Sequence, residues 1–356
     1  MSDPAPAPLR VDIVIDNHDY GRFLATAIES ACAQTHPRTR VIVVDDGSTD
    51  DSREVLRGFE DRVEVVLKEN GGQASALNAG AALCTGEVVI FLDADDLLHP
   101  QAAARAAAAL AAEPAAVKVS MRMEVIDEDG RPTGETKPPA RLRIPAGDLR
   151  RAGLAYPFDL PWLPTSGNAF RLEPLRQILP IPEGRERVGA DWYLIHLSTL
   201  LGPAAAVDEV SCAYRVHGAN SYEQQGAEID LDRVRATVRY GQETAAELLA
   251  LARRLGLRHP ERILSVADVG QRLISLRLDP RHHPVPDDTV PGLLRDSAAA
   301  VSRRDNVSMA LRLAFRLWFG AMAVSPRPMA RHLARWFLFP SRRRLLSRAF
   351  GGLQRP

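Results

Sequence analysis

Short apolar runs alternate with helical patterns over the first third of the chain. The runs are VDIVID (11–16), RVIVV (40–44), RVEVVL (62–67) and EVVIFL (87–92). Continuous apolar strands separated by helices indicate parallel pairing, because helices then cover both faces of the sheet. Helical patterns are expected at 20–34, within NGGQASALNAGAAL, and from about Pro100. We therefore predict an α/β domain with a mostly parallel central sheet.

The remaining chain changes character twice. Residues 130–147 are rich in proline and glycine and predict a loop or linker. Residues 156–217 read as α+β material of the same domain, and helical patterns dominate beyond Glu228, interrupted at 279–288. The predicted organisation is a disordered N-terminus, one α/β domain and a C-terminal helical extension, at 1–10, 11–225 and 226–356.

Composition indicates a soluble globular protein. The chain has 356 residues, of which 46% are hydrophobic and 25% charged. Its three cysteines form no metal-binding or disulfide pattern, which favours a reducing compartment. The first ten residues lack the apolar segment of a signal peptide, and no run approaches the roughly 18 apolar residues of a membrane-spanning helix. We expect a cytoplasmic location.

Charge is distributed unevenly along the chain. Residues 301–356 contain twelve arginines and one acid, a net charge of about +11, while the whole chain is neutral. Within 310–350 we expect amphipathic helices, broken at Pro326 and Pro328 and with a third near Arg342, each with a basic and an aromatic face. Such helices lie in membrane interfaces, which predicts a peripheral position on the inner face of the membrane. The alternative is a helix pair packed on the catalytic domain. No nucleic-acid-reading motif accompanies the charge.

Acidic clusters follow three of the predicted strands: DNHD (16–19), DDGSTD (45–50) and DADD (93–96). Carboxyl ends of parallel strands meet at one sheet edge, so the clusters predict one site. Carboxylates spaced like Asp93 and Asp95 suit Mg²⁺ or Mn²⁺, which prefer oxygen ligands and stabilise a diphosphate leaving group. The alternative is that Asp95 or Asp96 caps the helix near Pro100, which we favour for Asp96.

The order of these motifs resembles the family 2 glycosyltransferases of the GT-A fold, from residue 11 to 100 and less continuously to about 220. The resemblance implies a nucleotide-binding half at 11–120 and an acceptor half at 121–225. It implies inverting, metal-dependent transfer of one sugar from a nucleotide-diphosphate donor, with UDP or dTDP favoured, to an acceptor hydroxyl of a carbohydrate or glycolipid. The segment HLARW (332–336) lacks the glutamine of the processive members' motif, which indicates a non-processive enzyme.

Site residues follow from the resemblance position by position. Asp16 and His18 would border the nucleotide base, although the family usually has proline and tyrosine there. The other donor-side residues would be Asp46 on the base, Gly72 and Gln73 in the turn facing the nucleotide, Asp93 on the ribose or metal, and Asp95 as the main metal ligand. Asn78 is interpreted as a packing residue.

The acceptor half is expected to supply the base and a closing ligand. In RVGADWYLIHLSTL (187–200), Asp191 would be the catalytic base, while Ala190 replaces the family's acidic companion. The alternative is that Asp191 only favours the dipole of its helix. In YRVHGANS (214–221), His217 would complete the metal site and Arg215 would contact phosphate. The acceptor would lie near Gly167, Asn168 and Trp192, with Trp162 as either a sugar-binding wall or a core residue.

Three other functions compete with this interpretation. A phosphatase would place Asp-x-Asp on the first strand, and a nucleotidyltransferase would show a basic glycine-rich loop where this chain has DNHDYGRF. A catalytically degenerate, membrane-associated scaffold is the third, motivated by Ala190 and by the altered first motif.

Overall fold

The computed structural model describes residues 7–183, 189–218 and 228–339. Contacts divide the chain into two compact units: 1–150 with 161–223, and 151–160 with 224–356. The short segment 151–160 thus groups with the C-terminal helices, although the sequence pattern places it in the first domain.

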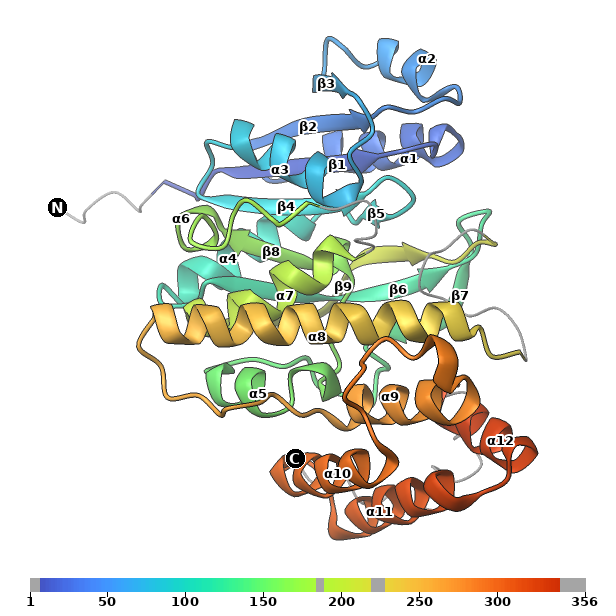
Figure 1. The fold of residues 1–356 in the computed structure, drawn as a ribbon. Coiled ribbons are helices and arrows are strands. Elements are labelled where there is room, and N and C mark those ends of the chain that lie inside the picture. Colours follow the sequence, from blue (N-terminus) through green and yellow to red (C-terminus); the bar gives the residue numbers. More distant parts are fainter. Residues whose placement is uncertain (1–6, 184–188, 219–227, 340–356) are drawn as a thin grey trace, which may run out of the picture. The chain divides into compact units, whose positions relative to one another are not determined.

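The first unit is built on one sheet of order β3-β2-β1-β4-β8-β6-β9-β5, with β7 paired to β6 (Figure 1). The four predicted strands are present and parallel, and together with the intervening helices they confirm the α/β class. They are β1 (Val11–Asn17), β2 (Thr39–Asp46), β3 (Glu64–Lys68) and β4 (Val88–Asp93). Strands β1 and β4 are buried almost throughout, as continuous apolar runs predict.

Helices connect these strands and cover the sheet. They are α1 (Gly21–Cys32), α2 (Ser52–Arg57), α3 (Gln73–Leu83) and α4 (Ala102–Ala112). Helix α3 packs closely on β1, because a Cβ atom at Gly80 would lie only 2.2 Å from Cγ1 of Val14. The predicted helix at 70–83 therefore needs this glycine to reach the sheet.

The second half of the sheet brings distant segments to the end of β4. Strand β8 (Asn168–Arg171) pairs antiparallel with β4 and with β6 (Lys118–Ile126), and β9 (Ala204–Arg215) runs parallel to β6. The two-residue strand β5 (Leu97–Leu98) then pairs with β9. This pairing places the carboxyl end of β9 beside the loop that follows β4. Helices α5 (Arg150–Ala155), α6 (Leu172–Leu175) and α7 (Ala190–Leu201) complete the connections.

The prediction of a loop at 130–147 is wrong in part. Strand β7 (Pro132–Lys137) pairs antiparallel with β6 after a turn in which Asp127 accepts hydrogen bonds from the backbone of Asp129 and Arg131. Its side chains are largely exposed, so it has no apolar alternation to reveal it. Proline is compatible with this position because it begins an edge strand.

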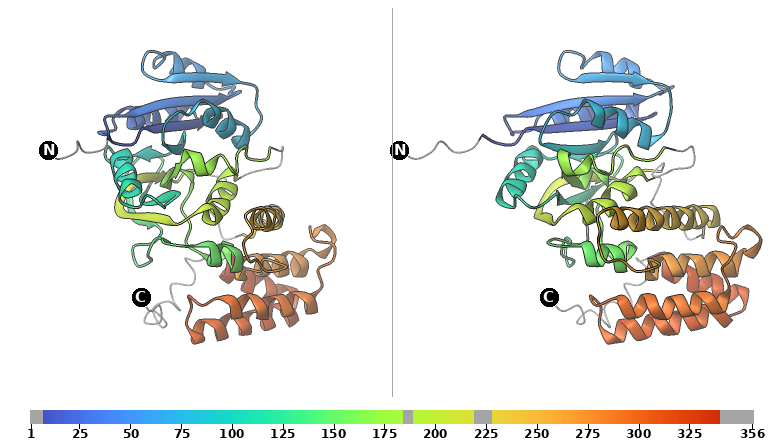
Figure 2. Two further views of the ribbon diagram at one scale, coloured as in Figure 1. Left: turned by 90° about the vertical axis from the view of Figure 1, so that its left-hand side faces the viewer. Right: turned by 60° about the vertical axis from the view of Figure 1, so that its left-hand side comes forward.

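The second unit is helical, as predicted. Its helices are α8 (Leu231–Arg254), α9 (Val266–Leu278), α10 (Val290–Arg303), α11 (Met309–Val324) and α12 (Arg327–Leu338), with a 3₁₀ turn (Pro280–His282) at the predicted interruption (Figures 1 and 2). The expectation of an aromatic outer face in the tail is wrong, because Trp318, Phe319 and Phe337 are buried in this unit's core. The expected helix near Arg342 lies outside the described residues. None of the described helices is both long and apolar enough to cross a membrane.

Candidate active site

Two half-buried acids lie side by side at the carboxyl ends of the neighbouring strands β1 and β4. Asp16 and Asp93 are register partners on β1 and β4, and Gln73 Nε2 donates a hydrogen bond to Asp93 Oδ1 at 3.0 Å. Burial raises the pKa of Asp16 to about 7, an effect that a hydrogen bond from Gln73 partly offsets. Burial and the charge of Asp16 raise the pKa of Asp93 well above its usual value. Two such groups repel each other when both are ionised. At low cost, the pair therefore either keeps a proton or binds a cation.

The acids that follow β4 join this pair. One carboxylate oxygen from each of Asp93, Asp95 and Asp96 lies within 4.8 Å of the other two. Asp96 is 1% exposed, and its Oδ1 accepts a hydrogen bond from the backbone N–H of Arg215 at 2.9 Å. Helix α4 has Gln101 as its N-cap, so the interpretation of Asp96 as a helix cap is wrong. Asp96 instead belongs to the acidic cluster.

His217 lies at the same cluster. Its Nε2 is 2.9 Å from Oδ2 of Asp95, and the imidazole ring packs against Tyr20 and Phe23 of the segment after β1. The structure thus brings together the two residues that the sequence predicts as metal ligands, although they are 122 positions apart. The pairing of β5 with β9 is what places them together.

The cluster fits a divalent cation. Oδ1 of Asp16 and Oδ2 of Asp96 are buried and have no hydrogen-bond partner. Among the charged neighbours of these acids, His217 lies against Asp95 and Arg215 reaches Asp96 through its backbone N–H. Carboxylate oxygens with one imidazole form a ligand set that Mg²⁺ and Mn²⁺ accept.

Arg215 holds the loop that carries these acids. Its buried side chain donates to the backbone carbonyl of Asp95 at 2.8 Å and to those of Asp127 and Glu128. The guanidinium also lies 4.8 Å from the ring centre of Phe23. These contacts give Arg215 a structural role, and its predicted phosphate contact stays a prediction.

Asp46 fixes the turn between β3 and α3. Its carboxylate accepts hydrogen bonds from Lys68 Nζ at 2.5 Å and from the backbone N–H groups of Gly71 and Gly72 at 3.0 and 2.7 Å. Gly72 has a φ of +84°, a conformation that favours glycine. The predicted contact of Asp46 with a nucleotide base stays a prediction. Its carboxylate oxygens already accept hydrogen bonds from three donors within the chain.

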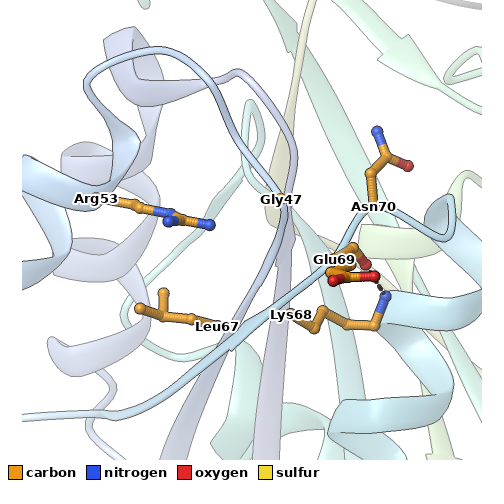
Figure 3. Close-up of a pocket in the computed structure, with 6 residues that line it drawn as sticks. All are labelled: Gly47, Arg53, Leu67, Lys68, Glu69 and Asn70. Atoms are coloured by element: carbon orange, nitrogen blue, oxygen red, sulfur yellow. Dashed lines mark hydrogen bonds between the residues drawn. The ribbon is translucent and has the colours of Figure 1, made fainter.

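A hollow of about 450 Å³ lies beside Asp46, at the ends of β2 and β3 (Figure 3). It is lined by Gly47, Arg53, Leu67, Lys68, Glu69 and Asn70. The exposed ring of His18 is close to it, since Nε2 lies 2.9 Å from Nδ2 of Asn70. The sequence predicted His18 here, but it did not single out Lys68, Arg53 or Asn70. The polar segment KEN directly after the third strand was the available signal.

Asp191 begins the acceptor side of the site. It lies in the first turn of α7, after Gly189 in a left-handed conformation, and its Oδ1 accepts a hydrogen bond from the N–H of Trp192 at 2.8 Å. Burial raises the pKa of Asp191 to about 6. Its charge also contributes to the raised pKa of Asp93. The role of Asp191 as the base stays a prediction.

Two of the predicted acceptor residues are buried. A Cβ atom at Gly167 would lie 2.8 Å from Sδ of Met123, and Asn168 is fully buried. The amide of Asn168 donates to the carbonyls of Leu163 and Pro164 and accepts from Ser120. These contacts make both residues supports of the site, and a direct acceptor contact stays a prediction.

The predicted Trp192 belongs to a cluster that sequence reasoning missed. The half-buried rings of Trp162 and Trp192 both pack against His196, at centroid distances of 5.5 and 5.2 Å. Beneath Trp162 lies Lys118, fully buried, with its Nζ 5.0 Å from the ring centre and without a hydrogen-bond partner. Burial lowers the pKa of Lys118 to about 7. The sequence around Lys118 does not indicate that this lysine is buried beside a tryptophan ring.

Comparisons with known proteins agree with this architecture. The family model described as glycosyl transferase family 2 matches residues 12–179. An uncharacterized glycosyltransferase of Nostoc sp. is 35% identical over 220 residues, which are 60% of this chain and 67% of the relative. An undecaprenyl-phosphate 4-deoxy-4-formamido-L-arabinose transferase of Pseudomonas savastanoi is 40% identical over 99 residues, 25% of this chain, and only 29% of that relative's length is spanned.

Solved structures of low sequence identity share the fold. S. aureus TarS 1–349 aligns with a TM-score of 0.51 and 14% identity, over 94% of this chain and 92% of that one. A mannosyltransferase from Pyrobaculum calidifontis, solved with GDP-Man and Mn²⁺, aligns with a TM-score of 0.50 and 18% identity, over 97% and 91%.

Proposed function

The chain belongs to family 2 of the glycosyltransferases, and on that premise we propose that it transfers one sugar, with inversion, from a nucleotide-diphosphate donor to an acceptor hydroxyl. The observation that carries this proposal is the gathering of Asp93, Asp95, Asp96 and His217 at the carboxyl end of β4. A degenerate scaffold would have no need to keep these groups together. Family membership also disfavours the phosphatase and nucleotidyltransferase alternatives.

The donor diphosphate would lie at the acidic cluster. Asp95 and His217 would hold Mn²⁺ or Mg²⁺, with Asp93 and Asp96 completing the oxygen ligands. When bound there, such a cation would neutralise negative charge on the leaving diphosphate. Neither ion is favoured over the other by these ligands.

The nucleoside would occupy the hollow beside Asp46. His18, Lys68 and Asn70 surround this space with groups that can stack on a base or hydrogen-bond to it. We favour UDP or dTDP, because a carboxylate at Asp46 can accept the ring N–H of uracil or thymine. Structures of the same fold contain UDP-GlcNAc in TarS and GDP-Man in the archaeal mannosyltransferase, so the fold itself accepts either base.

Asp191 would act as the catalytic base. Its carboxylate would accept the acceptor hydroxyl proton as the oxygen attacks the anomeric carbon and the bond to the diphosphate breaks. With a pKa of about 6, the group is ionised at neutral pH and still basic enough to hold a proton. The buried Ala190 removes the family's second acid without displacing Asp191 from the helix start.

The acceptor is proposed to be a carbohydrate or a lipid-linked glycan in cell-surface synthesis, reached from the inner face of the membrane. Support comes from the relative named as an undecaprenyl-phosphate sugar transferase, and from the basic C-terminal helices. The missing glutamine in HLARW supports addition of one sugar at a time.

The test is Asp191→Asn. We expect nucleotide binding to be retained and transfer to fall by at least ~10²-fold, the usual contribution of a general base. For the wild type, the transfer rate should decline as the pH falls below about 6, where Asp191 becomes protonated. The exposed Asp148→Asn is the matched control and should transfer normally. Near-normal transfer by Asp191→Asn would remove this residue from the role.

A further inference from the structure

Helix α11 presents an apolar stripe to solvent. Met309, Leu313, Leu317 and Val324 are 75%, 57%, 65% and 83% exposed. At 3.6 residues per turn these positions fall within an arc of roughly 80°. The opposite side of the helix is buried in the core through Phe315, Trp318, Phe319 and Met322. The helix is therefore apolar on two faces, of which one packs in the core of the second unit and the other is exposed.

Exposed hydrophobic side chains are concentrated in and near this stripe. Over the described residues six large hydrophobic side chains are strongly exposed, and five of them lie between 309 and 329, with Met329 as the fifth. Exposed apolar side chains that gather in this way mark binding surfaces, whereas single ones do not.

Unpaired positive charge accompanies the stripe. Arg312 and Arg316 border one side of the stripe on α11, where they also donate to the carbonyl of Arg304 and to Ser302 Oγ. Arg327, Arg331 and Arg335 follow at intervals of four on α12. Within the part of the chain that the structure describes, none of these five arginines forms an ion pair, and the sequence has no acid after Asp305.

We propose that the exposed stripe of α11, together with the arginines of α11 and α12, binds the surface of an anionic lipid bilayer. The aliphatic side chains of the stripe enter the headgroup region and the arginines contact lipid phosphates. A second copy of the chain is a poorer occupant, because a shared face would bring arginines against arginines. The proposal deepens the peripheral location given above, but it requires neither donor binding nor transfer.

The test is vesicle flotation of the purified full chain, without donor or acceptor. One set of vesicles is phosphatidylcholine alone, and the other is phosphatidylcholine mixed with phosphatidylglycerol. We expect binding to the mixed vesicles only, weakened by high salt. Leu313→Gln/Leu317→Gln should abolish it. Leu67→Gln should not, although it removes the strongly exposed large hydrophobic side chain that the described residues have outside 309–329. Arg327→Gln/Arg331→Gln should weaken binding by about fivefold per arginine.

Every variant keeps residues 340–356, so the differences report on α11 and α12. Absence of binding to anionic vesicles would overturn the proposal, as would equal binding by the double-glutamine stripe variant. A concentration-dependent dimer that the stripe variant loses would also overturn it and assign the face to a second copy. Because transfer is not part of the assay, loss of activity in Asp191→Asn and loss of vesicle binding are separate results.

Discussion

Each of the two units contains a group of buried acids, and the two groups differ in their hydrogen-bond partners and in their pKa values. In the helical unit, Asp288 receives hydrogen bonds from Arg272 and His283, and Asp268 is within reach of Arg272 as well. At the sheet edge of the first unit, Oδ1 of Asp16 and Oδ2 of Asp96 have no hydrogen-bond partner among the described residues, and burial raises the pKa values of Asp16, Asp93 and Asp96.

The difference separates a structural cluster from a functional one. Burial opposes the ionisation of Asp288, but the hydrogen bonds from His283 and Arg272 outweigh it and lower its pKa. Asp288 thus has its partners within the chain, although burial raises the pKa of Asp268 to about 6. At the sheet edge two carboxylate oxygens are left without a hydrogen-bond partner among the described residues, which is a condition expected of a site that binds a cation with its substrate.

The largest expected effect comes from breaking the cluster of the helical unit. Arg272→Met leaves buried carboxylates unpaired, so we expect a loss of about 3–5 kcal/mol in the free energy of unfolding of the helical unit. Urea denaturation followed by circular dichroism measures it. Arg262→Met, which removes an exposed partner of Asp296, is the control and should cost no more than about 1 kcal/mol. Equal losses would show that burial does not distinguish these pairs.

A smaller effect, of opposite sign, is expected at Lys118. Its amine is buried without a hydrogen bond, so Lys118→Met should stabilise the chain by about 1–2 kcal/mol at pH 7. Between pH 7 and the ordinary lysine pKa the unfolded chain binds the extra proton, so the advantage of methionine should shrink as pH rises. Lys137→Met, which removes an amine 3.9 Å from the ring of Tyr214, should instead destabilise slightly. A Lys118→Met variant that is less stable than the wild type would show that the amine of Lys118 stabilises the fold.

A pH dependence of stability is expected at the sheet edge. In the folded chain Asp16 keeps its proton up to about pH 7, whereas in the unfolded chain it loses it near 3.8. The folded state therefore binds more protons between these values, and stability should fall as pH rises through them, by up to about 1.4 kcal/mol for each pH unit. Melting temperatures at pH 5 and pH 7.5, for wild type and Asp16→Asn, measure this contribution. A wild-type decline no steeper than that of Asp16→Asn would contradict the raised pKa.

Much of the first unit was predictable because its signals are local. Four apolar runs predicted β1 to β4, and three acidic clusters predicted the edge at which they meet. Asp95 and His217 could be paired only through the family resemblance, since the two-residue strand β5 that joins their segments is too short to recognise. The polar edge strand β7 was missed for lack of apolar alternation.

Side-chain environments were much less accessible. Nothing local distinguishes Asp96 in the cluster from a helix cap, or Arg215 on backbone carbonyls from a phosphate ligand. The aromatic residues of α11 were assigned to a membrane face because amphipathic periodicity does not say which of two apolar faces is buried. Trp318 and Phe337 stack in the core at 4.4 Å, and the aliphatic side remains outside.

The most direct measurement is a thermal-shift panel of UDP, dTDP, GDP and CMP, each with and without Mn²⁺, on wild type and Asp95→Ala. The account predicts that one nucleotide, UDP or dTDP, stabilises the wild type only when Mn²⁺ is present, and that Asp95→Ala loses this response. Stabilisation that is independent of the metal, or that survives in Asp95→Ala, would contradict a cation site among the acids after β4.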